Sequence, residues 1–376
     1  MAKKPTQDKI FEVSGWVNFL GGLIERTKNF WVRLGHWESK FLKEDLNQTR
    51  VEKPIYVSGL ARSGSTLILE ILSRHQGVVS HQYKDFPPIY TPFWWNWLLK
   101  WMLIKKVEPT ERAHRDGMMI TPDSPEAMEE ILWMTFFPSV HNPMMTSVLD
   151  QNTSHPDFET FYHDHIRKLL LVRKGSRYLA KGNYNLTRLE YILKLFPNAR
   201  FVIPIRHPIT HIASLMKQHA LFCQGESENP QALKHLQRIG HFEFGLDIRP
   251  INTGDNQQTQ ELMNLWQTKQ DIQAWSRYWS QIYGYIADRL EANPNLQSAS
   301  QIIRFEDLCE SPEKMLNALM EHTDLKEGQA VVKEFAGKIK LPSYYKPNFS
   351  DEDIDTIVQE TRQVAQRFGY TFDGNG

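Results

Sequence analysis

Residues 57–72 read VSGLARSGSTLILEIL, and residues 59–66 within them, GLARSGST, nearly match the phosphate-binding pattern G-x-x-x-x-G-K-[S/T]. The lysine position holds Ser65, and Arg62 lies inside the loop. An apolar run at 54–58 predicts a buried strand before the loop, and 66–74 predicts a helix after it. A glycine loop between a strand and a helix binds phosphate oxygens through its backbone N–H groups and the helix N-terminus. The stretch therefore predicts a site for a phosphorylated ligand.

Strand and helix patterns alternate along the rest of the chain. Further strands are expected at 177–183, 197–208 and 300–308. Helices are expected over 157–174, 186–195 and 257–290, and from 351 onward. Three more are expected to begin at Pro208, at Ser124–Pro125 and at Ser311–Pro312. Residues 223–256 are expected to form a polar excursion. This alternation predicts an α/β fold with a P-loop-like core, in which helices flank a central parallel sheet. We expect a helical N-terminal extension over 1–50 and one domain over 51–376.

Composition narrows the class of protein. Lys+Arg and Asp+Glu both number 44, so any phosphate site must come from local charge, and nucleic-acid binding is not indicated. The two cysteines, Cys223 and Cys309, favour a reducing compartment. The N-terminus lacks a signal-peptide pattern, and no uncharged apolar run reaches 18 residues. We expect a cytoplasmic protein, with membrane association as an open alternative.

The residue types in the loop bear on the reaction. Nucleotide hydrolases use the loop lysine on the β- and γ-phosphates, and Ser65 cannot replace it. Arginine, in contrast, offers a two-pronged hydrogen-bond donor to phosphate.

The close histidine pairs, His207 with His211 and His163 with His165, have no third ligand nearby, so we expect no metal ion.

Three segments of the chain resemble the PAPS-dependent sulfotransferases, which use 3′-phosphoadenosine 5′-phosphosulfate (PAPS) as donor. The first is the loop, in which RSGST stands where the family has a similar string after its first strand. The second is Arg206 at the end of a strand with Ser214 eight residues later, and the third is RFEDLCESPEKML at 304–316. The segment KGNYNLTRLEYILKLFPNARFV from Lys181 also follows the family layout. The likeness covers about residues 54–325 and is closer to the bacterial and tyrosylprotein-type branch than to the cytosolic phenol and steroid enzymes of the family.

The resemblance implies a function and a set of site residues. It implies sulfuryl transfer from PAPS to a hydroxyl or amine by in-line displacement, without a metal. It places the 5′-phosphosulfate on Arg62, Ser63, Gly64, Ser65 and Thr66, with Arg62 also stabilising charge on the leaving phosphate. It places the 3′-phosphate on Arg206 and Ser214. A late basic loop of the family would correspond to Lys340 or Lys346.

The general base is less clearly marked. In tyrosylprotein-type enzymes a glutamate about 20 residues past the loop arginine has this role, and an ungapped match places Gln82 there. A short gap brings in Asp85, which we favour, and one step back lies His81. If Asp85 is the base, burial should raise its pKa toward neutral. The segment DSPEAMEE supplies the alternatives Asp123, Glu126, Glu129 and Glu130, although Glu126 there is expected to stabilise a helix dipole.

Two further questions stay open at this point. In FWWNWLLKW, Trp94, Trp97 and Trp101 share one helical face, which favours core packing or a lid over the acceptor, with a membrane surface or lipid acceptor as the alternative. The acceptor class is open between a small molecule, a sugar, a lipid and a peptide. The rival functions are a degenerate P-loop kinase or NTPase and a non-catalytic nucleotide-binding protein.

Overall fold

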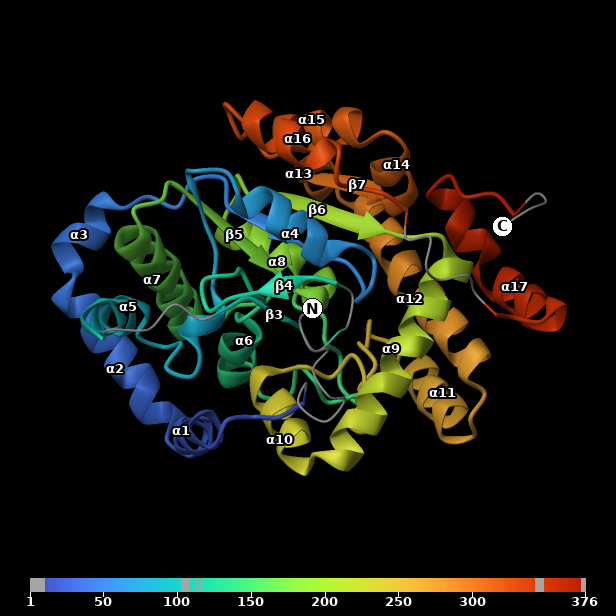
Figure 1. Ribbon diagram of the computed structural model, residues 1–376, viewed down its shortest axis with the longest axis horizontal. Coiled ribbons are helices and arrows are strands. Elements are labelled where there is room, and N and C mark those ends of the chain that lie inside the picture. The colour runs from blue at the N-terminus through green and yellow to red at the C-terminus, as the bar shows by residue number, and fades with distance from the viewer. Residues whose placement is uncertain (1–10, 103–107, 113, 115–116, 342–347, 373–376) are drawn as a thin grey trace.

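The computed structural model describes residues 11–102, 108–112, 114, 117–341 and 348–372. Its centre is a five-stranded parallel sheet in the order β2-β5-β1-β6-β7 (Figure 1). The strands are β1 (Ile55–Val57), β2 (Val78–Val79), β5 (Arg177–Lys181), β6 (Arg200–Ile205) and β7 (Ser300–Arg304). The expected α/β fold with a parallel sheet is confirmed.

Helices surround this sheet, and a small antiparallel hairpin, β3 (Thr110–Glu111) with β4 (Met119–Ile120), lies beside it. The helices are α1 (Gly15–Arg26), α2 (Lys28–Phe41), α3 (Lys43–Gln48), α4 (Ser65–Ser73), α5 (Pro92–Trp101), α6 (Glu130–Phe136), α7 (Pro156–Arg173), α8 (Leu189–Leu195), α9 (Pro208–Glu228), α10 (Pro230–Ile239), α11 (Asn256–Gln267), α12 (Asp271–Ala292), α13 (Pro294–Ala299), α14 (Phe305–Glu310), α15 (Pro312–His322), α16 (Gln329–Ala336) and α17 (Asp351–Arg367), with 3₁₀ turns η2 (Tyr83–Asp85) and η3 (Asn183–Thr187).

Both faces of the sheet are buried, because successive side chains of a strand point to opposite sides. Tyr56 and Phe201 belong to the larger hydrophobic core, which α7 and α12 help to form. Their neighbours Ile55 and Val202 belong to a second core, formed with α4, α15 and α16. In Figure 1, α15 and α16 lie above the sheet, and α6, α9 and α12 lie below it or beside its end.

The strand order places four loops at one edge of the sheet. Val57 is in register with Lys181 on one side and with Val202 on the other, and Ile205 is in register with Arg304. All these strands are parallel, so their carboxyl ends meet at the same edge. After β1 the chain forms β2 and β5 on one side of β1. It then crosses over and forms β6 and β7 on the other side of β1. Ligands of open α/β sheets bind at such a reversal of strand order.

The N-terminal helices expected from the sequence are present as α1, α2 and α3. They lie along one side of the molecule, where α1 contacts α10 and both α2 and α3 contact α7. The boundary at residue 50 stays a prediction. Among the described residues, no helix is both long enough and apolar enough to cross a membrane.

Three expectations about local structure are wrong. Ser124–Pro125 does not open a helix, because Pro125 forms a β-bridge with Gln82 and the helix begins only at Glu130. The helix expected over 257–290 is two helices, separated at Lys269, which adopts a positive φ of 57°. The excursion at 223–256 is partly helical, since α9 continues to Glu228 and α10 follows.

Candidate functional site

The glycine loop connects β1 to α4, as the sequence predicts. Gly64 caps α4 with a φ of 101°, and a Cβ atom there would lie 2.8 Å from the Phe305 ring. Arg62 also has a positive φ, 71°, which is uncommon for a residue with a side chain. Such strained backbone is concentrated at ligand-binding loops. The loop is therefore held in a conformation that only glycine permits at position 64.

A buried histidine contacts the backbone of the glycine loop. His211 on α9 lies 2.9 Å from the carbonyl oxygen of Ala61 through Nε2, and the Trp279 indole donates to its Nδ1 at 3.1 Å. Burial lowers the pKa of His211 to about 3. The ring is therefore neutral, with its proton on Nε2 donated to the loop carbonyl. This histidine belongs to the scaffold of the loop and has both ring nitrogens occupied.

The structure brings the loop together with the second motif. The Arg62 side chain donates from Nε to Ser214 Oγ at 3.2 Å. Arg206, directly after β6, donates from Nε to Thr210 Oγ1 at 3.2 Å, and its guanidinium lies 5.2 Å from the centre of the Phe305 ring. Phe305 therefore contacts Arg206 and also closes the space beside Gly64. The three sequence segments that carried the resemblance meet at one edge of the sheet.

The remaining loop residues are largely enclosed. Ser63 and Ser65 are buried at the start of α4. Thr66 accepts a hydrogen bond from Arg112 Nη1 at 3.3 Å. Arg112 follows β3 and is 7% exposed, so the β3–β4 hairpin adds a buried cation to the loop. Sequence reasoning missed Arg112, because nothing local to the hairpin points to the loop.

Lys181 and Glu126 are opposite charges that influence each other at the same edge. Lys181 ends β5, beside the end of β1. Burial lowers the pKa of Lys181, against the opposing charge of Glu126. For Glu126 burial acts to raise the pKa, but the Lys181 charge and a hydrogen bond from Tyr83 outweigh it, so the pKa is lowered overall. Glu126 is thus an ionised, partly exposed carboxylate close to Lys181.

The position of Glu126 follows from the bridge between Gln82 and Pro125. Its backbone N–H donates to the His81 carbonyl oxygen at 3.0 Å, and its Oε1 accepts from the Ala127 N–H at 2.7 Å. Because no helix starts here, the expected role of Glu126 as a helix-dipole residue is wrong. The sequence signal that could have found this pairing is RYLAK, which ends a predicted strand on a lysine.

Histidines and a second carboxylate lie beyond this pair. Burial, followed by the charges of Arg112 and His241, holds the pKa of His114 well below its usual value. His241 Nδ1 lies 3.4 Å from Glu243 Oε2, and Asn183 donates to Glu243 Oε1 at 2.9 Å. The site therefore continues from the loop toward α10 as a polar surface.

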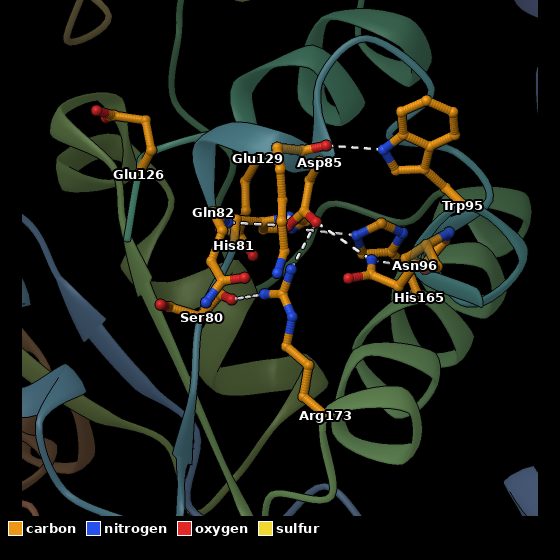
Figure 2. A network of polar contacts seen from close by, with 12 residues as sticks. Ser80, His81, Gln82, Asp85, Trp95, Asn96, Glu126, Glu129, His165 and Arg173 are labelled. Atoms are coloured by element: carbon orange, nitrogen blue, oxygen red, sulfur yellow. Dashed lines mark hydrogen bonds and ion pairs between the residues drawn. The ribbon is translucent and has the colours of Figure 1, made fainter. Parts of the chain in front are cut away.

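Asp85 lies in a different, buried network (Figure 2). Its Oδ2 accepts from the Gln82 N–H at 2.9 Å and lies 3.3 Å from His81 Nδ1. Its Oδ1 accepts from Arg173 Nη2 at 2.5 Å and from Asn96 Nδ2 at 3.2 Å. Burial acts to raise the pKa of Asp85, but the His81 hydrogen bond and the Arg173 charge hold it well below its usual value. The rise in pKa that a role of Asp85 as the base would require is therefore absent.

His81 is likewise enclosed by this network. Its Nε2 lies 3.1 Å from Nε2 of His165, and the two rings stack with centres 5.0 Å apart. Arg173 also donates to the carbonyl oxygen of Ser80. His81 and Asp85 are each only 2% exposed. In Figure 2, Glu126 points away from the network.

The other sequence candidates are placed as follows. Glu129 accepts hydrogen bonds from the Tyr162 and Tyr178 hydroxyls, and burial raises its pKa. Glu130 pairs with Arg188 at 2.8 Å. Burial acts to raise the pKa of Glu130, but Arg188 and His141 together outweigh it and lower the pKa to about 2. Asp123 is exposed and pairs with Lys84; Lys340 is exposed, and Lys346 lies outside the described residues.

The chain is similar to known proteins in sequence and in fold. A family model described as "Sulfotransferase family" matches residues 54–241. Sulfotransferase STF9 from Mycobacterium avium superposes with a TM-score of 0.52 at 14% identity, covering 90% of this chain and 83% of that one. Sulfotransferase STF1 from Mycobacterium tuberculosis H37Rv gives a TM-score of 0.47 at 14% identity, covering 92% and 86%. No curated protein sequence matches significantly.

Proposed function

Because the chain belongs to the sulfotransferase family, we propose that it transfers a sulfuryl group from PAPS to a hydroxyl or amine acceptor, with Glu126 as the general base. The observation that carries this proposal is the meeting of Arg62, Arg112, Lys181 and Arg206 at the carboxyl edge of the sheet. Four cations there match a donor with phosphate groups at both ends. The finer placement near the tyrosylprotein-type branch stays a prediction.

The chemistry of these residues fits PAPS. Gly64 is the N-cap of α4, where a side chain would clash with Phe305, and the N-terminus of a helix favours a phosphate group. Arg62 and Arg206 provide guanidinium groups, which bind phosphate and sulfate in a two-pronged manner. Arg112, on Thr66, places a further cation beside the start of α4. The residues present thus offer anion-binding groups of the kind and number that the donor needs.

The position of each residue in the site suggests which part of PAPS it would bind. The loop residues 62–66 would hold the 5′-phosphosulfate, and Arg206 with Ser214 would hold the 3′-phosphate. PAPS, when bound, supplies the sulfuryl group, and adenosine 3′,5′-bisphosphate is the product. Arg62 and Lys181 would supply the positive charge that stabilises the leaving phosphate. The contact between Arg62 and Ser214 orients Arg62 before any ligand binds.

Glu126 supports base catalysis better than Asp85 does. A general base must reach the proton of the acceptor. Both Asp85 oxygens are engaged by protein groups in a buried network, whereas Glu126 is partly exposed and ionised beside Lys181. Glu126 would accept the proton of the acceptor hydroxyl or amine as the new bond to sulfur forms. Asp85 and His81 would instead hold the segment that carries Glu126.

The test is a transfer assay with radiolabelled PAPS and a panel of acceptors that covers phenols, sugars, amines, lipids and tyrosine peptides. We expect labelled product with at least one class, equally in the presence of a metal chelator. The Arg206→Ala variant should lose activity through weaker donor binding. Phosphoryl transfer from ATP with Mg²⁺, without any transfer from PAPS, would overturn the proposal in favour of a kinase.

A further inference from the structure

Exposed aromatic side chains gather on three helices away from the nucleotide site. All seven exposed tryptophans and phenylalanines in the described part of the chain are here, with 52–73% of each side chain exposed. We call this set, with three exposed aliphatic neighbours, the aromatic face: Trp16, Phe19 and Leu23 on α1, Phe30, Trp37 and Phe41 on α2, and Trp97, Leu98, Trp101 and Met102 on or directly after α5. Of the two roles expected for Trp97 and Trp101, core packing is wrong, and a lid over the acceptor stays a prediction.

The three helices form one surface. They lie next to each other on one side of the molecule (Figure 1), and α1 contacts α2. The rings of Phe41 and Trp94 join α2 to α5, with centres 6.1 Å apart. A concentration of exposed apolar side chains of this extent marks an interaction site.

A buried ion pair fixes the aromatic face to the domain. Glu38, fully buried on α2, accepts from the Trp94 N–H at 2.6 Å and pairs with Lys168 on α7 at 3.2 Å. Lys168 also donates to the Gly35 carbonyl oxygen at 2.6 Å. A Cβ atom at Gly35 would lie 2.7 Å from Phe161, so α2 fits closely against α7. The helices therefore present their aromatic residues from a rigid support.

The sides of these helices that face the domain already bury apolar residues against it. The aromatic face is therefore a separate surface and not an exposed part of the core. Ile24 on α1 and Leu42 after α2 are buried, as are Gly21 and Gly35. These residues make the contacts with the domain. The large rings of the aromatic face are exposed and do not take part in these contacts.

The charges around the aromatic face are mostly positive. On α2 every exposed charged residue is basic, because its one acid is the buried Glu38. The exposed acids nearby are Glu12 before α1, Glu25, which is paired with Arg238 at 2.9 Å, and Glu44 and Asp45 on α3. The exposed bases are Arg26, Lys28, Arg33, Lys40, Lys43 and Lys100. In a chain with a formal net charge of zero this is a local excess of positive charge.

A hollow on α2 adds a place for an anionic group. Its volume is about 530 Å³, and its walls include Arg33, Lys40 and Lys43 beside Trp37. One acid, Asp164, also lines it and lies 3.5 Å from Arg167. Basic side chains around an opening bordered by tryptophan match the headgroup region of a membrane, where tryptophan rings and cations both gather.

We propose that the aromatic face docks on the surface of a membrane that contains anionic phospholipid. Tryptophan and phenylalanine side chains would enter the interface, and the basic residues would contact lipid phosphates. This docking goes beyond sulfuryl transfer and does not depend on it. The helices lie on the membrane and do not cross it, in agreement with the lack of a spanning helix among the described residues.

The test is co-sedimentation of the full-length protein with vesicles of phosphatidylcholine and phosphatidylglycerol in equal amounts, and with phosphatidylcholine alone. We expect binding to the anionic vesicles that weakens with salt. The pair Trp97→Ser and Trp101→Ser should lower the partition coefficient at least about tenfold. The pair Arg33→Glu and Lys40→Glu should lower it by at least as much at low salt.

Matched controls lie elsewhere on the chain. Met144→Ser with Met145→Ser removes two side chains from residues that are 47% and 48% exposed. Lys333→Glu, on the distant α16, with Lys338→Glu, two residues after its end, reverses two exposed charges. Both controls should bind vesicles like the wild type. Absence of wild-type binding, or equal binding by all variants, would overturn the proposal. So would a dimer in lipid-free solution that the tryptophan changes dissociate, because the aromatic face would then bind a second copy.

Discussion

Asp85 and Glu126 lie on the two segments that the Gln82–Pro125 bridge joins, yet their surroundings differ. Asp85 is 2% exposed, and Arg173, Asn96, His81 and a backbone N–H surround its oxygens. Glu126 is partly exposed and is held ionised chiefly by Lys181 at the open edge of the sheet. A carboxylate that is fully enclosed by its partners stabilises the fold, whereas a partly exposed one beside a cation is better placed to meet a substrate.

The largest expected effect on activity is at Glu126. Glu126→Gln removes the proposed base and keeps the size of the side chain, so kcat should fall about 10²- to 10⁴-fold. The melting temperature should stay close to that of the wild type. The measurement is steady-state transfer to whichever acceptor the panel identifies. Unchanged kcat in Glu126→Gln, with a loss in Asp85→Asn measured below its melting temperature, would reverse the two assignments.

The largest expected effect on stability is at Arg173. Arg173→Met leaves Asp85 buried without its cation, which should lower the free energy of unfolding by about 3–5 kcal/mol. Urea denaturation followed by circular dichroism measures this. Arg277→Met, which removes a partly exposed partner of Glu360, is the matched control and should cost under about 1 kcal/mol. Equal losses in both variants would show that the Asp85 network contributes no special stability.

The Asp85 network should also be visible as a pH dependence. Since the pKa of Asp85 is lowered in the folded state, its contribution is present above its unfolded pKa of about 3.9 and is lost as the pH falls. Asp85→Asn should therefore be less stable than the wild type at neutral pH, and the difference should shrink below about pH 4. Urea denaturation of both proteins over this range measures the difference. A gap that stays constant down to pH 3 would contradict the lowered pKa.

The smallest expected effect is at Ser214. Ser214→Ala removes one hydroxyl from the proposed 3′-phosphate site and the acceptor of the Arg62 hydrogen bond. The affinity for adenosine 3′,5′-bisphosphate should fall by about 1 kcal/mol, or roughly fivefold. Ser298→Ala, at an exposed serine that bonds to Asn295, is the control and should bind like the wild type. Equal affinity of the two variants would remove Ser214 from the proposed site.

The sequence predicted the parts of the fold and site that depend on local pattern. The loop at 59–66, the strand ends before it and before Arg206, and the flanking helices all carry short-range signals of strand, turn and helix. Lys181 and Arg112 were missed because their proximity to the loop depends on strand order and on a hairpin, which local pattern does not encode.

The errors also have physical causes. Ser124 and Pro125 are residue types that favour the start of a helix. The tertiary pairing of Pro125 with Gln82 outweighs this local preference. As a result, Glu126 lies at the edge of the sheet and not in the first turn of a helix, where the sequence predicted it. Asp85 was expected to have a raised pKa because burial was weighed without Arg173, a cation that lies 88 positions away in the sequence.

The most direct test of the contrast between the two carboxylate regions is calorimetric titration of adenosine 3′,5′-bisphosphate into the wild type, Arg206→Ala and Asp85→Asn, at a temperature where all are folded. The account predicts that Arg206→Ala binds at least about tenfold more weakly than the wild type, while Asp85→Asn binds within about twofold of it. No binding by the wild type, or a loss in Asp85→Asn equal to that in Arg206→Ala, would contradict it.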